Sequence, residues 1–86
     1  MNLELGHLRL VVTVADAEDL RTAAHRLQIS QQCLLERLGR IEAAFGGALF
    51  AHGDGYLAPT AAGRYVVDCA RGILDTLHDM GAHGTP

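Results

Sequence analysis

Apolar residues recur at spacings of three and four positions in three successive segments of the chain. This spacing places them on one face of a helix, so each segment predicts an amphipathic helix. The three apolar stripes are Leu5, Leu8, Val12 and Ala15; Leu20, Ala23, Ala24 and Leu27; and Leu34, Leu38, Ile41 and Phe45. Asp19 and Ser30 are good N-caps for the second and third helices, and Gly46 is a good C-cap for the third. The short connection between these two helices is typical of a helix-turn-helix.

The apolar pattern changes after the third helix. Two short apolar segments, 48–51 and 56–58, flank the turn-forming sequence His-Gly-Asp-Gly at 52–55, which predicts a two-stranded β-hairpin. Pro59 is expected to end the second strand, because proline has no N–H for the ladder. Thr60 is the expected N-cap of a long last helix, and residues 81–86 are expected to form a flexible tail.

The last helix carries apolar residues over a wide arc, so it needs two surfaces to pack against. One is the core of its own domain, and we expect the other to be a second chain. Val66, Ile73 and Met80 recur every seven residues with Ala70 and Leu77 between them, which matches a short coiled-coil seam. These five are the predicted dimerisation residues. A stripe buried wholly within the chain is the alternative.

Together these patterns predict a mostly helical fold with three helices, a two-stranded hairpin and a long C-terminal helix. This is a winged helix-turn-helix, expected over residues 1–59, followed by a linker and dimerisation helix over 60–80 and the tail over 81–86. No apolar run approaches the roughly 20 residues that cross a bilayer. The N-terminus has no signal-peptide pattern, so we expect a soluble intracellular protein without a membrane partner.

Charge is unevenly distributed along the chain. The net charge is −3, and all seven basic residues are arginines. Residues 20–47 carry four of these arginines and only two acidic residues, whereas the segments before and after are acidic. A basic surface is the usual electrostatic signature of nucleic-acid binding, so any such surface is expected on the predicted helix-turn-helix.

The sequence shows no pattern that favours catalysis, a metal site or a cofactor. The two cysteines and five histidines lack metal-ligand spacing. No nucleophile stands beside a base in a known motif, and no phosphate loop is present. The sequence therefore predicts that the protein is not an enzyme, and Cys33 and Cys69 are expected to be packed as small apolar residues.

Six short motifs in order resemble the DNA-binding domain of LysR-type transcriptional regulators. They are the first apolar stripe; Leu20, Ala23, Ala24 and Leu27; Ser30-Gln31 followed by Leu34, Leu38, Ile41 and Glu42; Gly46 with Leu49-Phe50; Thr60-Ala61-Ala62-Gly63; and Ala70-Arg71-Gly72-Ile73-Leu74. The resemblance runs from about residue 3 to residue 80. The family's effector-binding domain has no counterpart in this sequence, so no site for a small-molecule effector is expected.

The resemblance implies a cytoplasmic, nucleoid-associated regulator that binds double-stranded DNA as a homodimer. The helix that begins after Ser30 would enter the major groove, where glutamine can pair with adenine and arginine can hold phosphate. The expected DNA contacts are Ser30, Gln31, Gln32, Leu35, Arg37 and Arg40 in and before this helix, Arg21 in the helix before it, and His52 in the wing.

Several family positions that read DNA hold other residues here. Leu35 and Glu36 occupy base-reading positions, and Gly39 stands where the family has a basic residue. The family's wing arginine is also missing. A second hypothesis therefore stays open: a protein-interaction module that kept the fold, lost most DNA affinity and modulates another regulator by pairing with it.

Overall fold

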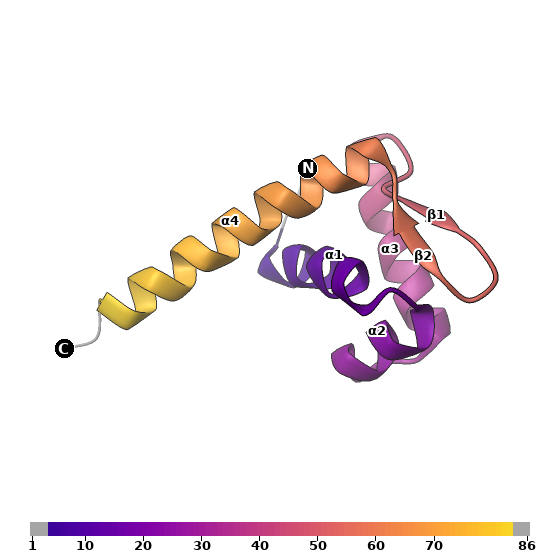
Figure 1. The fold of residues 1–86 in the computed structure, drawn as a ribbon, viewed down its shortest axis with the longest axis horizontal. Helices are drawn as coiled ribbons and strands as arrows, with labels where there is room; N and C mark the ends of the chain where they lie inside the picture. Colours follow the sequence, from indigo (N-terminus) through magenta and orange to yellow (C-terminus); the bar gives the residue numbers. More distant parts are fainter. Residues whose placement is uncertain (1–3, 84–86) are drawn as a thin grey trace.

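The computed structural model describes residues 4–83, with side chains described as far as Gly81. Its elements are, in order, α1 (Leu5–Ala17), α2 (Leu20–Leu27), α3 (Gln31–Phe45), β1 (Phe50–His52), β2 (Leu57–Pro59) and α4 (Ala61–His83). The strands pair antiparallel, with Phe50 opposite Pro59 and His52 opposite Leu57. The predicted fold class and element order are confirmed. Figure 1 shows α1, α2 and α3 clustered together, with the hairpin at one end of the molecule and the end of α4 at the other.

Local hydrogen bonds determine where three of the helices begin. Each predicted N-cap accepts a hydrogen bond from the backbone N–H three residues later, at 2.6 Å for Asp19 and 3.0 Å for Ser30 and Thr60. The bond from the Thr22 backbone lowers the pKa of the Asp19 carboxyl. Gly46 ends α3 in the left-handed conformation, with φ of 81°.

Every residue of the three predicted stripes except Leu5 is buried or packs against the core, but the most buried residues of α1 lie outside its predicted stripe. Its buried residues are Leu10, Val11, Val14, Ala17, Ala23, Ala24, Leu34, Leu38, Ile41, Leu49, Phe50, Leu57, Val67 and Ala70. In α1 the predicted Leu5 is exposed, while Leu8, Val12 and Ala15 only pack against the edge of this core. Since α1 contacts α2, α3 and α4, more than one of its faces is apolar, and spacing alone selected the less buried one.

The segment Ala48–Phe50 is hydrogen-bonded to the C-terminal half of α3. One carboxylate oxygen of Glu42 accepts two backbone hydrogen bonds, from the N–H of Leu49 at 2.7 Å and from that of Phe50 at 3.2 Å. Hydrogen bonds to an ionised acceptor are the stronger kind, and they satisfy two N–H groups that enter the core. Glu42 therefore fixes where the chain turns from α3 into β1.

The same segment is also hydrogen-bonded to Thr60, the residue before α4. The Thr60 N–H donates to the Leu49 carbonyl at 2.9 Å, and the Thr60 hydroxyl donates to the Ala48 carbonyl at 2.8 Å. A Cβ at Gly63 would lie 1.8 Å from the Leu49 carbonyl oxygen, so α4 can approach this closely only with glycine there. Both helices are thus tied to one short piece of backbone.

An ion pair fixes the middle of α4 against the end of α1. The Arg71 guanidinium donates to both oxygens of the Asp16 carboxylate, at 3.2 and 2.5 Å. This hydrogen bonding lowers the pKa of the Asp16 carboxyl. Beyond the other helices, α4 extends to the far end of the molecule (Figure 1).

Element bounds differ from the prediction in two places. The strands begin and end slightly later than expected, and Pro59 is the last residue of β2, where a missing N–H matters least. α4 is helical to His83, so the expectation of a flexible tail is wrong for residues 81–83, while 84–86 lie outside the described residues. The division into units at residue 59 stays a prediction. None of the helices within residues 4–83 is long and apolar enough to cross a membrane.

Gly63→Ala should destabilise the protein strongly, because the new Cβ collides with the Leu49 carbonyl oxygen. We expect a loss of about 2–4 kcal/mol in the free energy of unfolding, the range of severe backbone and packing defects. Gly39→Ala is the matched control, since a Cβ at Gly39 meets nothing within 4 Å, and it should stabilise by about 0.5–1 kcal/mol. Urea denaturation measures both, and equal effects of the two variants would contradict the close approach.

Asp16→Asn should reduce stability at neutral pH by at most about 1 kcal/mol, because both side chains of the ion pair are over 40% exposed. The folded pKa of Asp16 is lowered below the unfolded value near 3.8, so its contribution is present above that value. It is lost as pH falls through the folded pKa. Urea denaturation at neutral pH and near pH 2 compares wild type, this variant and Asp54→Asn. A deficit that persists in acid, or appears equally in Asp54→Asn, rules out the ion pair as its cause.

Candidate nucleic-acid interface

The connection between α2 and α3 sets the direction of α3. Gln28 adopts the left-handed conformation, with φ of 58°, and its N–H donates to the His25 carbonyl at 3.1 Å. The Ile29 N–H donates to the Ala24 carbonyl at 3.1 Å, which closes the end of α2. Ala23 is fully buried between the helices, so α3 can pack closely. The opposite face of α3 is left in solvent.

That solvent face carries polar residues and a single acidic group. Gln31, Gln32, Glu36 and Gly39 are exposed, and Leu35 is half-buried. The Gln32 side-chain amide donates to the Glu36 carboxylate at 3.4 Å, so the two side chains are held side by side. The first turns of α3 therefore offer hydrogen-bonding groups, and Arg40 follows Glu36 one helical turn later.

Arg37 and Arg40 are exposed on another flank of α3. They line a shallow cavity of about 350 Å³ together with Glu4, His7 and Leu10, which lie at the start of α1. The sequence grouped both arginines with the glutamines of the same helix. The structure places them beside the N-terminal turn of α1, because α3 turns their side chains toward that neighbour.

Arg21 belongs to a second basic cluster on α2. It lines a cavity of about 260 Å³ with Thr22, His25 and Arg26. Sequence reasoning counted the charge of Arg26 but did not select it as a contact. The signal was available, because Arg21, His25 and Arg26 fall on the side of α2 away from its buried alanines.

The wing is tied to the start of α2. His52 is exposed in β1, and Gly55 turns the chain at the tip with φ of 81°. The Leu20 N–H donates to the Gly55 carbonyl at 3.1 Å, so the tip cannot swing independently of α2. The wing and the helix-turn-helix thus form one surface.

Tyr56 is an exposed aromatic residue on this surface that sequence reasoning did not select. Its side chain is 53% exposed. The ring lies across Gly53, where a Cβ would come within 1.8 Å of it. An aromatic residue directly after a turn was the available signal. Glycine at position 53 gives the ring its place at the wing tip.

Three of the five predicted dimerisation residues are exposed on α4. Ile73, Leu77 and Met80 are 47%, 41% and 62% exposed, and Val66 is half-buried. Ala70 is only 1% exposed, because it packs in the core of its own chain, so its inclusion was wrong. Cys69 and Tyr65 extend the exposed stripe in its place.

The two cysteines differ in exposure. Cys33 is half-buried, whereas Cys69 is exposed, so the expectation that both are packed is wrong for Cys69. Within the described part of the chain, no group of three or more His, Cys, Asp or Glu residues is placed to hold a metal ion.

The family comparison matches residues 5–64 to the bacterial regulatory helix-turn-helix proteins of the lysR family. The chain belongs to the LysR family. The resemblance inferred from its six motifs is therefore confirmed, and the matched residues contain all of α1, α2, α3 and the wing.

Relatives of this LysR-family chain are named regulators. It is 41% identical over 80 residues to the small neutral protease regulatory protein of Streptomyces coelicolor A3(2), covering 93% of this chain and 24% of that protein. It is 38% identical over 82 residues to the uncharacterized HTH-type transcriptional regulator YnfL of Escherichia coli K12, covering 95% of this chain and 28% of that protein. The chain thus spans about a quarter of the length of these curated relatives.

Solved structures of DNA-binding domains from the family match the fold. The CbnR DNA-binding domain in complex with DNA superposes with a TM-score of 0.85 at 29% identity, covering 95% of this chain and 94% of that one. The BenM DNA-binding domain on the benA site 1 DNA has a TM-score of 0.87 at 27% identity and covers 95% of each chain. The winged helix-turn-helix is therefore confirmed.

Proposed function

We propose that the chain is a sequence-specific, double-stranded-DNA-binding transcriptional regulator that acts as a cytoplasmic homodimer. One observation carries the proposal: nearly the whole chain superposes on two family domains that were solved on DNA. α3 is the recognition helix, and its solvent face enters the major groove. We assign no catalytic role, cofactor or effector site to these residues.

Base reading falls to the solvent face of α3. Gln31 and Gln32 lie exposed in its first turn, where glutamine amides can pair with adenine. Leu35 can contact a thymine methyl, and Glu36 can accept from a cytosine amine. Gln32 and Glu36 act as a linked pair, since the amide already donates to the carboxylate.

Phosphate binding falls to the residues that flank this face. Arg21 with Arg26 on α2, and Arg37 with Arg40 on α3, supply the two basic clusters. Ser30 before α3 and His52 in the wing are also exposed. These few cations can neutralise only a few DNA phosphates. We therefore expect moderate affinity for DNA, and an affinity that falls only slowly as the salt concentration rises.

Pairing of two copies places two recognition helices on one duplex. The C-terminal half of α4, which carries the exposed Ile73, Leu77 and Met80, extends away from the wing in Figure 1, so pairing through it leaves the proposed DNA surface free. A dimer also binds DNA more tightly than either copy alone. Once one copy is bound, the second copy binds its half-site as an intramolecular step.

A second candidate function has its own supporting observation. The exposed side of α3 carries the acidic Glu36 one helical turn before Arg40, and Arg37 and Arg40 line a cavity with Glu4 at the start of α1. This arrangement favours a module that has kept the fold, lost most DNA affinity, and pairs through α4 with another regulator.

Binding of the purified chain to labelled genomic DNA fragments separates the two functions. Fluorescence anisotropy at about 50 mM and 200 mM salt should show binding that weakens as salt rises, because counterions are released. The same titration on a fragment of unrelated sequence gives the non-specific level. Undetectable binding at the lower salt concentration would sink the DNA-binding function and leave the interaction module.

Two substitutions test the assigned roles within the interface. Arg40→Ala should weaken binding several-fold on every sequence and reduce the salt slope by about 1, because it removes a phosphate contact. Gln31→Ala should lower discrimination between sites by about 1–3 kcal/mol. Arg64→Ala, an exposed arginine on α4, is the matched control and should change neither. If both variants weaken binding by the same factor on every DNA sequence, Gln31 does not read bases and the assignment of separate roles to Arg40 and Gln31 is refuted.

A further inference from the structure

Four polar side chains line the cavity between the start of α1 and α3. Its lining residues are Glu4, Gly6, His7 and Leu10 on the α1 side and Arg37 and Arg40 on α3. The cavity has a volume of about 350 Å³. Because a water molecule takes up about 30 Å³ of liquid, a phosphate group fits in this space together with several waters.

The two arginines of the cavity have no partner within the described chain. Arg37 and Arg40 are three residues apart, so they are neighbours on one side of α3. Arg71 is held in an ion pair with Asp16, but neither Arg37 nor Arg40 has an ion pair or a hydrogen bond among residues 4–83. A guanidinium carries several N–H donors in a fixed arrangement that suits an oxyanion. The pair is therefore free to bind one.

The His7 ring is held with one nitrogen free of a proton. The Glu4 backbone N–H donates to His7 Nδ1 at 3.3 Å, so this nitrogen acts as an acceptor. The ring is then neutral and carries its hydrogen on Nε2. A second proton would break the bond from Glu4 and make both ring nitrogens donors. Histidine is the side chain that changes its charge between about pH 5 and pH 8.

The charged groups that face His7 come from both sides of the cavity. They are the Glu4 carboxylate and the two arginines of α3, which together carry a charge of +1. Arg9, the next charged residue of α1, lines a different cavity with His78 on α4. A proton on His7 raises the charge of the site to +2. An anion in the cavity favours this charged form, because opposite charges at short range attract.

We propose that His7, Arg37 and Arg40 form a phosphate site that takes up one proton when it is occupied. The proton comes from solvent, and Nδ1 changes from accepting the Glu4 N–H to donating to the anion. Binding and protonation are linked, so affinity rises as pH falls. In the regulator bound to DNA the occupant is a backbone phosphate, and this part rests on the proposed function. A free tetrahedral oxyanion has the same chemistry.

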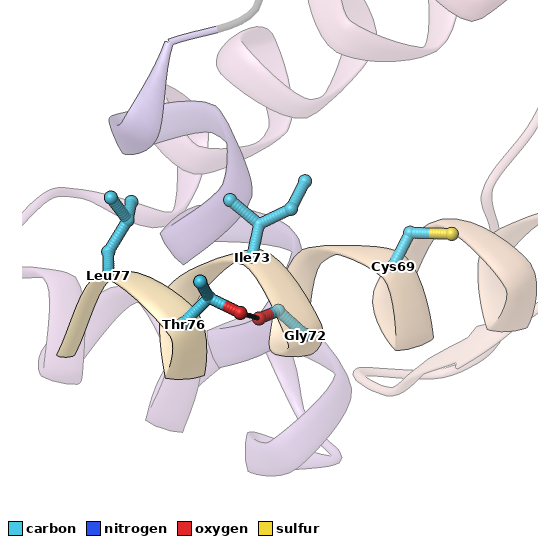
Figure 2. A pocket seen from close by; sticks show the side chains of 5 residues that line it. All are labelled: Cys69, Gly72, Ile73, Thr76 and Leu77. Atoms are coloured by element: carbon cyan, nitrogen blue, oxygen red, sulfur yellow. Dashed lines mark hydrogen bonds between the residues drawn. The ribbon is translucent and has the colours of Figure 1, made fainter. Parts of the chain in front are cut away.

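The exposed face of α4 is separate from this site. Figure 2 shows the side chains of Cys69, Ile73 and Leu77 on that face. None of these three residues lines the cavity of the two arginines. A substitution at His7 therefore changes the phosphate site and leaves the helix face proposed for pairing as it is.

His7→Gln separates the proton from the helix cap. A glutamine three residues after the N-cap can accept the Glu4 N–H, as in a capping box, but it cannot be protonated. His78→Gln is the matched control, because His78 is an exposed histidine of α4 outside the site. Both variants should keep the helix content and the melting temperature of the wild type, measured by circular dichroism.

Fluorescence anisotropy with a DNA duplex at about pH 8 and about pH 6 tests the proton uptake. At the higher pH, wild type and His7→Gln should bind equally. At the lower pH, wild type and His78→Gln should bind at least about threefold more tightly than His7→Gln. His25 and His52 are present in all three proteins, so the difference between the proteins reports on His7. Equal gains in all three, or a His7→Gln deficit of the same size at both pH values, overturn the proposal.

Sulfate, a tetrahedral oxyanion whose charge is constant over this pH range, tests the site without DNA. The midpoint of the His7 ring resonances in an NMR pH titration should lie at higher pH in sodium sulfate than in sodium chloride of equal ionic strength. Arg37→Ala should abolish this difference. A midpoint that sulfate does not move overturns the site, even if the protein binds DNA. A midpoint that moves in a protein that does not bind DNA removes the proposed function and leaves a site for a free oxyanion.

Discussion

The carboxylate of Glu42 and the backbone of Ala48–Phe50 hold the whole arrangement together. Glu42 draws the start of β1 onto α3, while Thr60 and Gly63 bring the start of α4 onto the same backbone. Leu49, at the centre of this segment, is only 2% exposed, and its N–H is satisfied by the Glu42 carboxylate. The helix proposed to read DNA, the wing and the helix proposed to pair are therefore oriented by one segment of three residues.

A second contact turns that local constraint into a long-range one. Arg71 and Asp16 fix α4 against α1 after α4 has left the core segment, so the projecting part of the helix has a defined direction. In the proposed homodimer, the distance between the two recognition helices then depends on how the α4 helices pair, rather than on a flexible linker. In this account the geometry of DNA reading is set at the far end of the molecule from the wing.

Features that depend on neighbouring residues could be predicted from the sequence. The caps at Asp19, Ser30 and Thr60, the left-handed Gly46 and the hairpin turn are local, and the structure confirms them. Features that depend on which elements meet could not. Spacing could not choose between the two apolar faces of α1, and it assigned Ala70 to a partner although its own core contains it. The flank of Arg37 and Arg40, and the exposure of Cys69, depend likewise on tertiary packing.

The proposal that a homodimer reads DNA through α3 is tested most severely by the charge of the chain. The scaffold of the family is present, but the helix proposed to read DNA carries an exposed acidic residue, Glu36. Selection of bound duplexes from a random DNA library by the purified protein tests the claim most directly. We expect enrichment of a two-fold-symmetric site whose half-sites lie about one helical turn, or a multiple of it, apart. A library that shows no enrichment, or an enriched site without symmetry, would contradict a homodimer that reads DNA through α3.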